Sequence, residues 1–163
     1  MKKWLIIVVV LCLAAWAMYQ VNKEPPVPIA TFHEKKVPLP ETDYDWGVTM
    51  TVVNPTPTGC TLKVTQSGGN PTGTVACGED YFLQALRDGD WYGVVLIAGD
   101  GYAIPAIAYI LSEEYPRNFN LNWEKIYGAL PAGTYRIGKA ILDGRAPGDY
   151  DKQNHYTEPF TIE

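Results

Sequence analysis

From Val48 to the C-terminus, the chain consists of short segments in which apolar and polar residues alternate, separated by turn residues. The segment VTMTVV places Val48, Met50 and Val52 on one face, which is the pattern of a strand with one buried side. Segments such as NPTPTG and SGGNPTG are rich in residues typical of turns. Apart from one possible turn at WEKIYG, no segment has the period of an amphipathic helix. About nine strands can be counted, one of them YAIPAIAYIL over residues 102–111, and their spacing predicts an all-β sandwich of about seven to nine antiparallel strands.

The N-terminus has a different character, because two lysines precede an apolar run over residues 4–19. This run is shorter than the roughly twenty residues that a membrane-spanning helix usually needs. An A-x-A pattern that ends at Ala17 is typical of a signal-peptidase site. The sequence predicts a signal peptide over residues 1–17 or an uncleaved membrane anchor that extends to about residue 20. Both alternatives place the rest of the chain outside the cytoplasm, either secreted or tethered to the outer face of the cytoplasmic membrane.

Between this run and the strands, residues 18–37 contain three prolines, several charges and no usable period. Such a composition is typical of an extended linker. We therefore expect one domain over residues 38–163, which folds without the preceding residues. The formal net charge of −5 and the lack of a basic stripe argue against nucleic acid as a partner.

Two of the three cysteines, Cys60 and Cys77, lie in the predicted domain. Outside the cytoplasm such a pair usually forms a disulfide. If CTLKVTQ and TGTVAC form a hairpin, Cys60 lies directly opposite Cys77, and Leu62 lies opposite Val75 on the same face. Directly opposite residues at a non-hydrogen-bonded site have Cα atoms about 4.5 Å apart, which a disulfide can span. The register predicts a disulfide between Cys60 and Cys77, and the alternative is a pair of free thiols in the core.

Three aromatic residues crowd into the segment LNWEKIYGALPAGTYRIGKAI, and we interpret them as structural. Trp123 and Tyr127 lie one helical turn apart, on a short crossover that would close one end of the sandwich. Tyr135 follows the bend LPAG, where a tyrosine hydroxyl can bond back to the backbone upstream. We expect Tyr135 to be buried and to bond a backbone group within 130–133.

The segments PTPTGCTLKV, GEDYFLQALRDGDWYGV and NWEKIYGALPAGTYRIGK resemble the bacterial Ig-like domain of small secreted or membrane-tethered proteins, mainly of Gram-positive bacteria. The resemblance runs from about Val48 to Ile162. It implies an Ig-like β-sandwich without known catalytic activity and without established catalytic or ligand residues. The pair of cysteines, Cys60 and Cys77, departs from the usual pattern.

Residues with catalytic or metal-binding chemistry form no recognised motif in this sequence. The two histidines, His33 and His155, fall in the predicted linker and just before the last strand. Two acidic runs could offer oxygen ligands to calcium, although solvated loop acids are the favoured interpretation. The acids in question are Asp43, Asp45, Asp143, Asp149 and Asp151. We therefore expect no enzyme activity, no metal and no cofactor.

Exposed aromatic side chains could instead stack on sugar rings, although strand spacing places most of them in the core. The candidates are Tyr81, Trp91, Tyr92, Tyr102, Tyr109 and Tyr115. The sequence thus favours a non-catalytic binding or structural module whose partner is an unknown protein or cell-envelope component. The alternatives are a carbohydrate-binding module and an enzyme inhibitor that inserts the loop GDGYAIPAIAY into a cleft.

Overall fold

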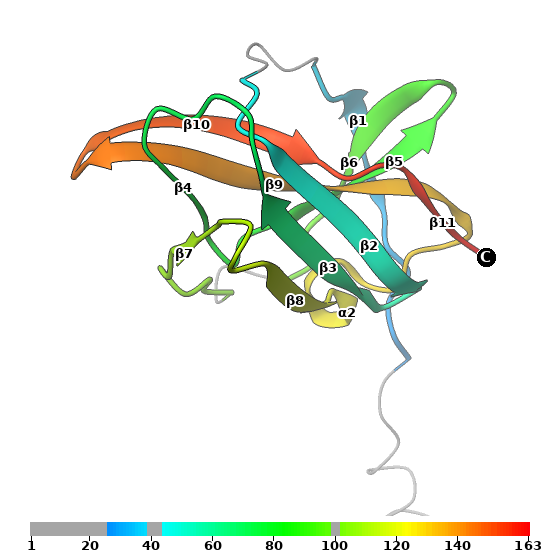
Figure 1. The fold of residues 1–163 in the computed structure, drawn as a ribbon. Helices are drawn as coiled ribbons and strands as arrows, with labels where there is room; N and C mark the ends of the chain where they lie inside the picture. The colour runs from blue at the N-terminus through cyan, green and yellow to red at the C-terminus, as the bar shows by residue number, and fades with distance from the viewer. Residues whose placement is uncertain (1–25, 39–43, 99–101) are drawn as a thin grey trace, which may run out of the picture.

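The computed structural model describes residues 26–38, 44–98 and 102–163, and these form an all-β fold (Figure 1). They contain one short helix, α2 (Glu124–Tyr127), and eleven strands. The strands are β1 (Phe32–Lys36), β2 (Val48–Thr56), β3 (Gly59–Gln66), β4 (Thr74–Cys77), β5 (Phe82–Arg87), β6 (Asp90–Val94), β7 (Tyr109–Ile110), β8 (Arg117–Asn122), β9 (Gly133–Ala146), β10 (Asp149–Tyr156) and β11 (Phe160–Ile162).

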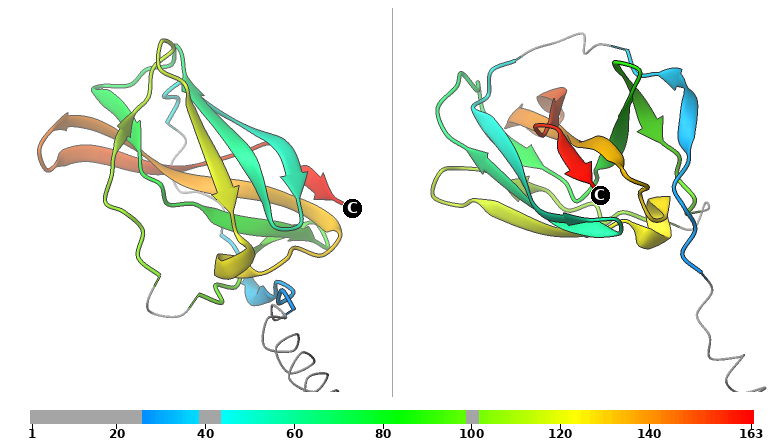
Figure 2. Two further views of the ribbon diagram at one scale, coloured as in Figure 1. Left: turned by 90° about the horizontal axis from the view of Figure 1, so that it is seen from below. Right: turned by 90° about the vertical axis from the view of Figure 1, so that its right-hand side faces the viewer.

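The strands form two antiparallel sheets that face each other across the core (Figure 2). The smaller sheet has the order β2-β3-β8, and the larger has the order β1-β6-β5-β9-β4-β7. The long strand β9 organises the larger sheet, since β5 and β4 pair along one of its edges and β11 and β10 pair along the other. This arrangement is consistent with the predicted Ig-like sandwich.

The alternation of polar and apolar residues decides which side of each strand is buried. In β3, Leu62 and Val64 are fully buried, as the sequence pattern predicts. In β9, every second residue from Tyr135 to Asp143 faces the interior. This inward row includes a lysine and an aspartate, Lys139 and Asp143, which are as inaccessible to water as the apolar residues beside them.

The predicted hairpin between the two cysteine segments is wrong. Strand β3 pairs with β2 and β8, whereas β4 pairs with β9 and β7, so the cysteines lie in different sheets. Residues 67–73 are a crossover, which is tied to the start of β2 by the bonds Ser67 N–H to Gly47 O and Asn70 N–H to Asp45 O. The structure also contains no disulfide between Cys60 and Cys77, and both residues are buried free thiols.

The predicted linker also needs correction, because its second half belongs to the fold. Strand β1 pairs with β6, and Ala30 is buried, with its N–H donating to Ala129 O at 2.8 Å. This strand could not be predicted from the sequence, because four of its five residues are exposed and it has no alternating apolar face. The predicted signal peptide or anchor over residues 1–17 lies outside the described residues. Within the described ranges, no helix has the length and hydropathy needed to cross a membrane.

Two further elements differ from the predicted strands. The segment predicted as a strand over residues 102–111 contributes only the two residues of β7. By contrast, β9 continues to Ala146 and turns into the eight-residue strand β10, whose sequence DYDKQNHY is polar on both faces. The reduction of one predicted strand to a short edge leaves an irregular apolar segment beside β8.

Candidate functional site

The aromatic cluster of the segment 121–141 stabilises a corner of the fold. Trp123 is fully buried, and its indole N–H donates to Pro57 O at 2.8 Å. Tyr127 is also buried, and its hydroxyl donates to Tyr81 O at 3.3 Å. Both partners are backbone carbonyls of the sandwich, so the polar groups of both side chains are already paired.

Tyr135 has the environment that the sequence predicts for it. The side chain is buried, and its hydroxyl donates to Pro131 O at 2.7 Å, within the predicted acceptor stretch 130–133. Burial raises the pKa of the Tyr135 phenol, so the hydroxyl keeps its proton at neutral pH. Its role is to hold the bend before β9.

A cleft of about 610 Å³ lies between β8 and the segment 102–109. Its lining includes the whole length of β8 and one side of the apolar segment, with Glu79 and Tyr81 also contributing. A second cavity of about 210 Å³ shares Tyr81, Tyr102 and Ile104 with the first and reaches Leu96. Both volumes together offer room for a ligand of several residues.

The aromatic residues of the cleft are packed against two cations. The Tyr109 ring lies edge-on to Phe119, with centroids 5.6 Å apart, and its hydroxyl donates to a Glu79 carboxylate oxygen at 2.7 Å. The Arg117 guanidinium lies 5.2 Å from the centre of the Tyr109 ring, and the Lys139 ammonium lies 4.4 Å from that of Phe119. Lys139 also donates to a backbone carbonyl at 2.7 Å. Burial lowers the pKa of Lys139.

Two buried polar atoms of the cleft lack hydrogen-bond partners among the described residues, the Tyr81 hydroxyl and Arg117 Nε. Buried polar groups are nearly always paired, because an unpaired one costs free energy. Burial also raises the pKa of Tyr81, which keeps its hydroxyl protonated and able to donate.

The edge of β8 that faces away from β3 supplies further hydrogen-bonding groups. The backbone N–H of Trp123 donates to the backbone oxygen of Thr58 directly opposite. This bond determines which residues of β8 form hydrogen bonds with β3, because bonded and non-bonded pairs alternate along an antiparallel ladder. Arg117, Phe119 and Leu121 therefore bond to β3, while the backbone groups of Asn118, Asn120 and Asn122 point away from it. All three asparagines line the cleft. No other described strand pairs with this edge.

The acidic residues do not form a metal site within the described part of the chain. The interpretation as solvated loop acids is wrong for Asp143, whose carboxylate is buried and accepts bonds from Thr72 N, Thr72 Oγ1 and Gly73 N at 2.6, 2.8 and 2.7 Å. Burial alone would raise the pKa of Asp143, but these bonds and the charge of Arg145 outweigh it and hold the pKa below its usual value.

The other acidic residues of the two runs lie near the surface or outside the described residues. Asp149 and Asp151 both pair with Arg145 at 2.8 Å. Asp45 accepts from Gly47 N, and Asp43 lies outside the described residues.

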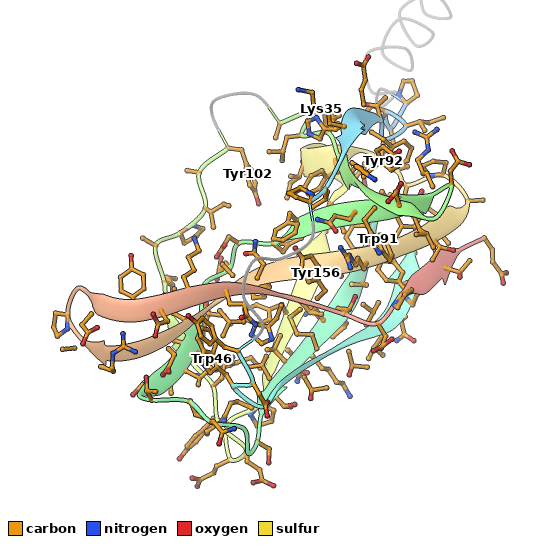
Figure 3. The ribbon with its side chains drawn as sticks, turned by 90° about the horizontal axis from the view of Figure 1, so that it is seen from above. Lys35, Trp46, Trp91, Tyr92, Tyr102 and Tyr156 are labelled. Carbon is orange, nitrogen blue, oxygen red and sulfur yellow. The ribbon has the colours of Figure 1, made fainter. Side chains whose placement is uncertain are left out.

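The predicted sugar-binding aromatics are not gathered on one platform. The Arg136 guanidinium lies 4.2 Å from the ring centre of Trp91 and 4.1 Å from that of Tyr156, so it covers a face of each ring. Tyr102 lies well apart from Trp91 and Tyr92 (Figure 3). Tyr81, Tyr102 and Tyr109 line the cleft instead, and Tyr115 is exposed near its end.

The two histidines lie outside the lining of the cleft. His33 lies on β1 next to Gly93, and His155 stacks on Trp46 with ring centroids 5.8 Å apart. The sequence alone did not point to this site, although the alternation of asparagine with Phe119 and Leu121 in RNFNLN was a signal that β8 has one exposed polar face.

The comparisons with known proteins concern the domain as a whole. A family model described as a bacterial Ig-like domain matches residues 44–161, more than two thirds of the chain. No curated protein and no solved structure matched. The matched range includes β2 to β10 and most of β11, and it leaves β1 outside.

Proposed function

Because the chain belongs to the bacterial Ig-like domain family, we propose that it is a non-catalytic module that binds a protein or cell-envelope partner outside the cytoplasm. Membership of the family supports a structural or binding role, and the features of the cleft decide between these two roles. The cleft beside β8 is the observation that favours binding. It combines an unpaired strand edge, two unpaired buried polar atoms and an exposed apolar wall.

The apolar wall is part of a larger exposed surface on residues 96–98 and 102–115. Its side chains are exposed to between 40% and 59% although they are large and apolar. They are Leu96, Ile97, Tyr102, Ile104, Ile107, Ile110 and Tyr115. Residues 96–98 are held in place by the N–H groups of Ile97 and Ala98, which donate to Ile126 O. Exposed apolar patches of this kind in a small protein mark interaction surfaces.

The extracytoplasmic location is supported by the sequence of residues 1–17, with its two lysines, its apolar run and its A-x-A pattern. The test is protease treatment of intact cells that express the full chain with a tag after Glu163. We expect the tag to be removed without cell lysis, or the tagged domain to appear in the medium. A tag that is protected until the membrane is permeabilised would contradict the proposed location.

The binding role is tested by crosslinking the tagged full chain in cells and comparing two tyrosine variants. Tyr102→Ser alters the apolar segment, whereas Tyr150→Ser alters the β9–β10 hairpin, and the two side chains are similarly exposed, at 45% and 54%. We expect one crosslinked partner to be lost in the first variant and kept in the second. Equal crosslinking of both variants and the parent protein would exclude this surface.

A further inference from the structure

Among the described sheet edges, strand β8 has the fewest features that block further pairing, with Arg117 as its one charged residue. Edge strands are normally protected by short length, bulges, prolines or charges. Among the described strands, β1, β2 and β10 each contain a register shift, and β7 and β11 have only two and three residues. Strand β8 pairs with β3 over all six of its residues without a shift, and it contains no proline.

The open edge lies inside the cleft, so a bound strand would meet side chains as well as backbone. The outward N–H and C=O groups of Asn118, Asn120 and Asn122 repeat at the spacing of an extended polypeptide. The apolar residues Tyr102 and Ile104 lie across the cleft from this edge. An extended chain offers alternating donors and acceptors that match such an edge, which a sugar or a compact ligand does not.

We propose that the edge of β8 binds an extended polypeptide segment of a partner protein, which joins the smaller sheet as a further strand and places an acidic side chain against Arg117. The proposal rests on the proposed function and specifies its ligand. Arg117 favours the acidic residue, because its side chain lines the cleft and forms no salt bridge with a described carboxylate.

The pleat of β8 fixes which ligand side chains enter the cleft. Arg117, Phe119 and Leu121 share the face of β8 that is turned to the interior. Ligand residues opposite these three point to the same side, since side chains of paired positions share a face. The ligand should therefore carry an acidic residue opposite Arg117 and apolar residues opposite Phe119 and Leu121, with a free choice of residue between them.

The first experiment measures binding of two fluorescein-labelled peptides, TVTVTDT and TDTVTVT, to the full chain in detergent solution by fluorescence anisotropy. The first peptide presents the acid opposite Arg117 in the antiparallel direction, and the second does so in the parallel direction. We expect saturable binding of at least one peptide. The control is the same peptide with N-methyl groups on the N–H groups that would pair with β8, and we expect it not to bind. If neither peptide binds at up to about 1 mM, the proposal is overturned.

A pair of variants at Asn120 separates the backbone from the side chain. Asn120→Pro removes an N–H that points away from β3, and proline is tolerated on such an edge. Asn120→Ala removes the side chain, with its 3.2 Å contact to Thr61, and keeps the N–H. We expect the proline variant to abolish peptide binding and the alanine variant to retain it, with thermal unfolding as the check that both fold. If Asn120→Pro fails to fold, the N-methylated peptide still decides the question. Binding that survives both changes would overturn the proposal.

The charge is tested with Arg117→Gln and with peptides in which asparagine replaces the aspartate. We expect the variant to weaken binding of the acidic peptide about tenfold or more and to leave the asparagine peptide nearly unaffected. An equal loss for both peptides would exclude the acidic contact. If the chain dimerises through β8 and Asn120→Pro abolishes the dimer, the occupant is a second copy and the proposal is wrong.

The peptide-binding experiments and the crosslinking experiment can fail independently, so a failure of the strand-addition proposal can be told apart from a failure of the proposed function. If crosslinking to a partner depends on Tyr102 and no peptide binds, the chain is a binding module that does not use strand addition. If a peptide binds and the Asn120→Pro variant keeps its crosslinks in cells, the strand edge is competent but is not the surface used there.

Discussion

At the scale of single residues, two side chains on β9 hold loops in place from inside the sandwich. Tyr135 bonds the bend at Pro131, and Asp143 bonds the crossover at Thr72 and Gly73. The sequence revealed the first, because a tyrosine after a Pro-Gly bend is a recurrent device of such sandwiches. It concealed the second, because an aspartate in an acidic loop and one that binds a turn look alike until the crossover is placed beside it.

Replacing Tyr135 with phenylalanine removes the hydroxyl and leaves the ring in its packing with Phe160. The Pro131 carbonyl then loses its buried donor, so we expect the free energy of unfolding to fall by about 1 kcal/mol or somewhat more. Chemical denaturation of the two proteins measures this. As a control, Tyr150→Phe alters an exposed hydroxyl and should leave stability unchanged. Equal stability of Tyr135→Phe and the parent protein would contradict the structural role of this bond.

Replacing Asp143 with asparagine should destabilise the fold and reduce its sensitivity to acid. The carboxylate accepts three hydrogen bonds, so its loss at neutral pH should cost on the order of 2 kcal/mol. Because the pKa of Asp143 is lower in the folded state than in the unfolded state, its contribution is fully present above the unfolded pKa of about 3.9 and is lost as the pH falls through the folded pKa. Stability curves from pH 7 down to pH 2 should therefore converge for the two proteins at low pH. Asp149→Asn, which alters an exposed ion pair, is the control and should have a smaller effect on stability. If the stability curves of the parent protein and Asp143→Asn stay parallel down to pH 2, the stabilising role of the Asp143 carboxylate is refuted.

At the scale of elements, exposure decides which strands could be predicted from the sequence. Strand β3 was predictable because Leu62 and Val64 alternate with polar residues and face the core. Strands β1 and β10 were not, because they lie at edges, where backbone pairing holds mostly exposed side chains. The Gly-rich segment 67–73 reads equally well as a hairpin turn and as a crossover, and only the pairing of β3 with β8 distinguishes them. The position of β8 beside the cleft depends on the same topology, so the site could not be predicted from local sequence.

Strand β1 should contribute to stability although it lies outside the family match. Phe32 packs against the core, 6.5 Å from the Tyr135 ring, and the Arg87 guanidinium lies 5.0 Å from the centre of the Phe32 ring. A fragment of residues 38–163 should therefore be less stable than one of residues 26–163 by at least about 2 kcal/mol, the value for burying one such side chain. Thermal unfolding of the two fragments measures the difference. His33→Ala in the longer fragment controls for the loss of an exposed β1 side chain. Equal stability of the two fragments would mean that β1 does not stabilise the domain and that residues 26–37 act only as a linker.

At the scale of the whole molecule, one core joins the two sheets, and each sheet contributes one cysteine to this core. Cys60 lies on β3 in the smaller sheet and Cys77 on β4 in the larger, and both belong to the same buried cluster. Burial raises the pKa of Cys60 to about 12 and also raises that of Cys77, where the charge of Lys139 opposes the shift. Because the thiolate is the reactive form, both thiols should be inert in the folded protein at pH 8.

Alkylation of the folded chain then requires opening of the sandwich, and its rate tests whether the two sheets open together. If they form one cooperative unit, Cys60 and Cys77 should react with iodoacetamide at the same slow rate, and a small amount of denaturant should accelerate both equally. Mass spectrometry of proteolytic peptides follows the two residues separately. Leu62→Ala, which leaves a cavity in the core, should accelerate both reactions because it destabilises the shared core. Faster labelling of Cys60 alone would mean that the three-stranded sheet opens by itself, and such local opening would bring the β8 edge with it.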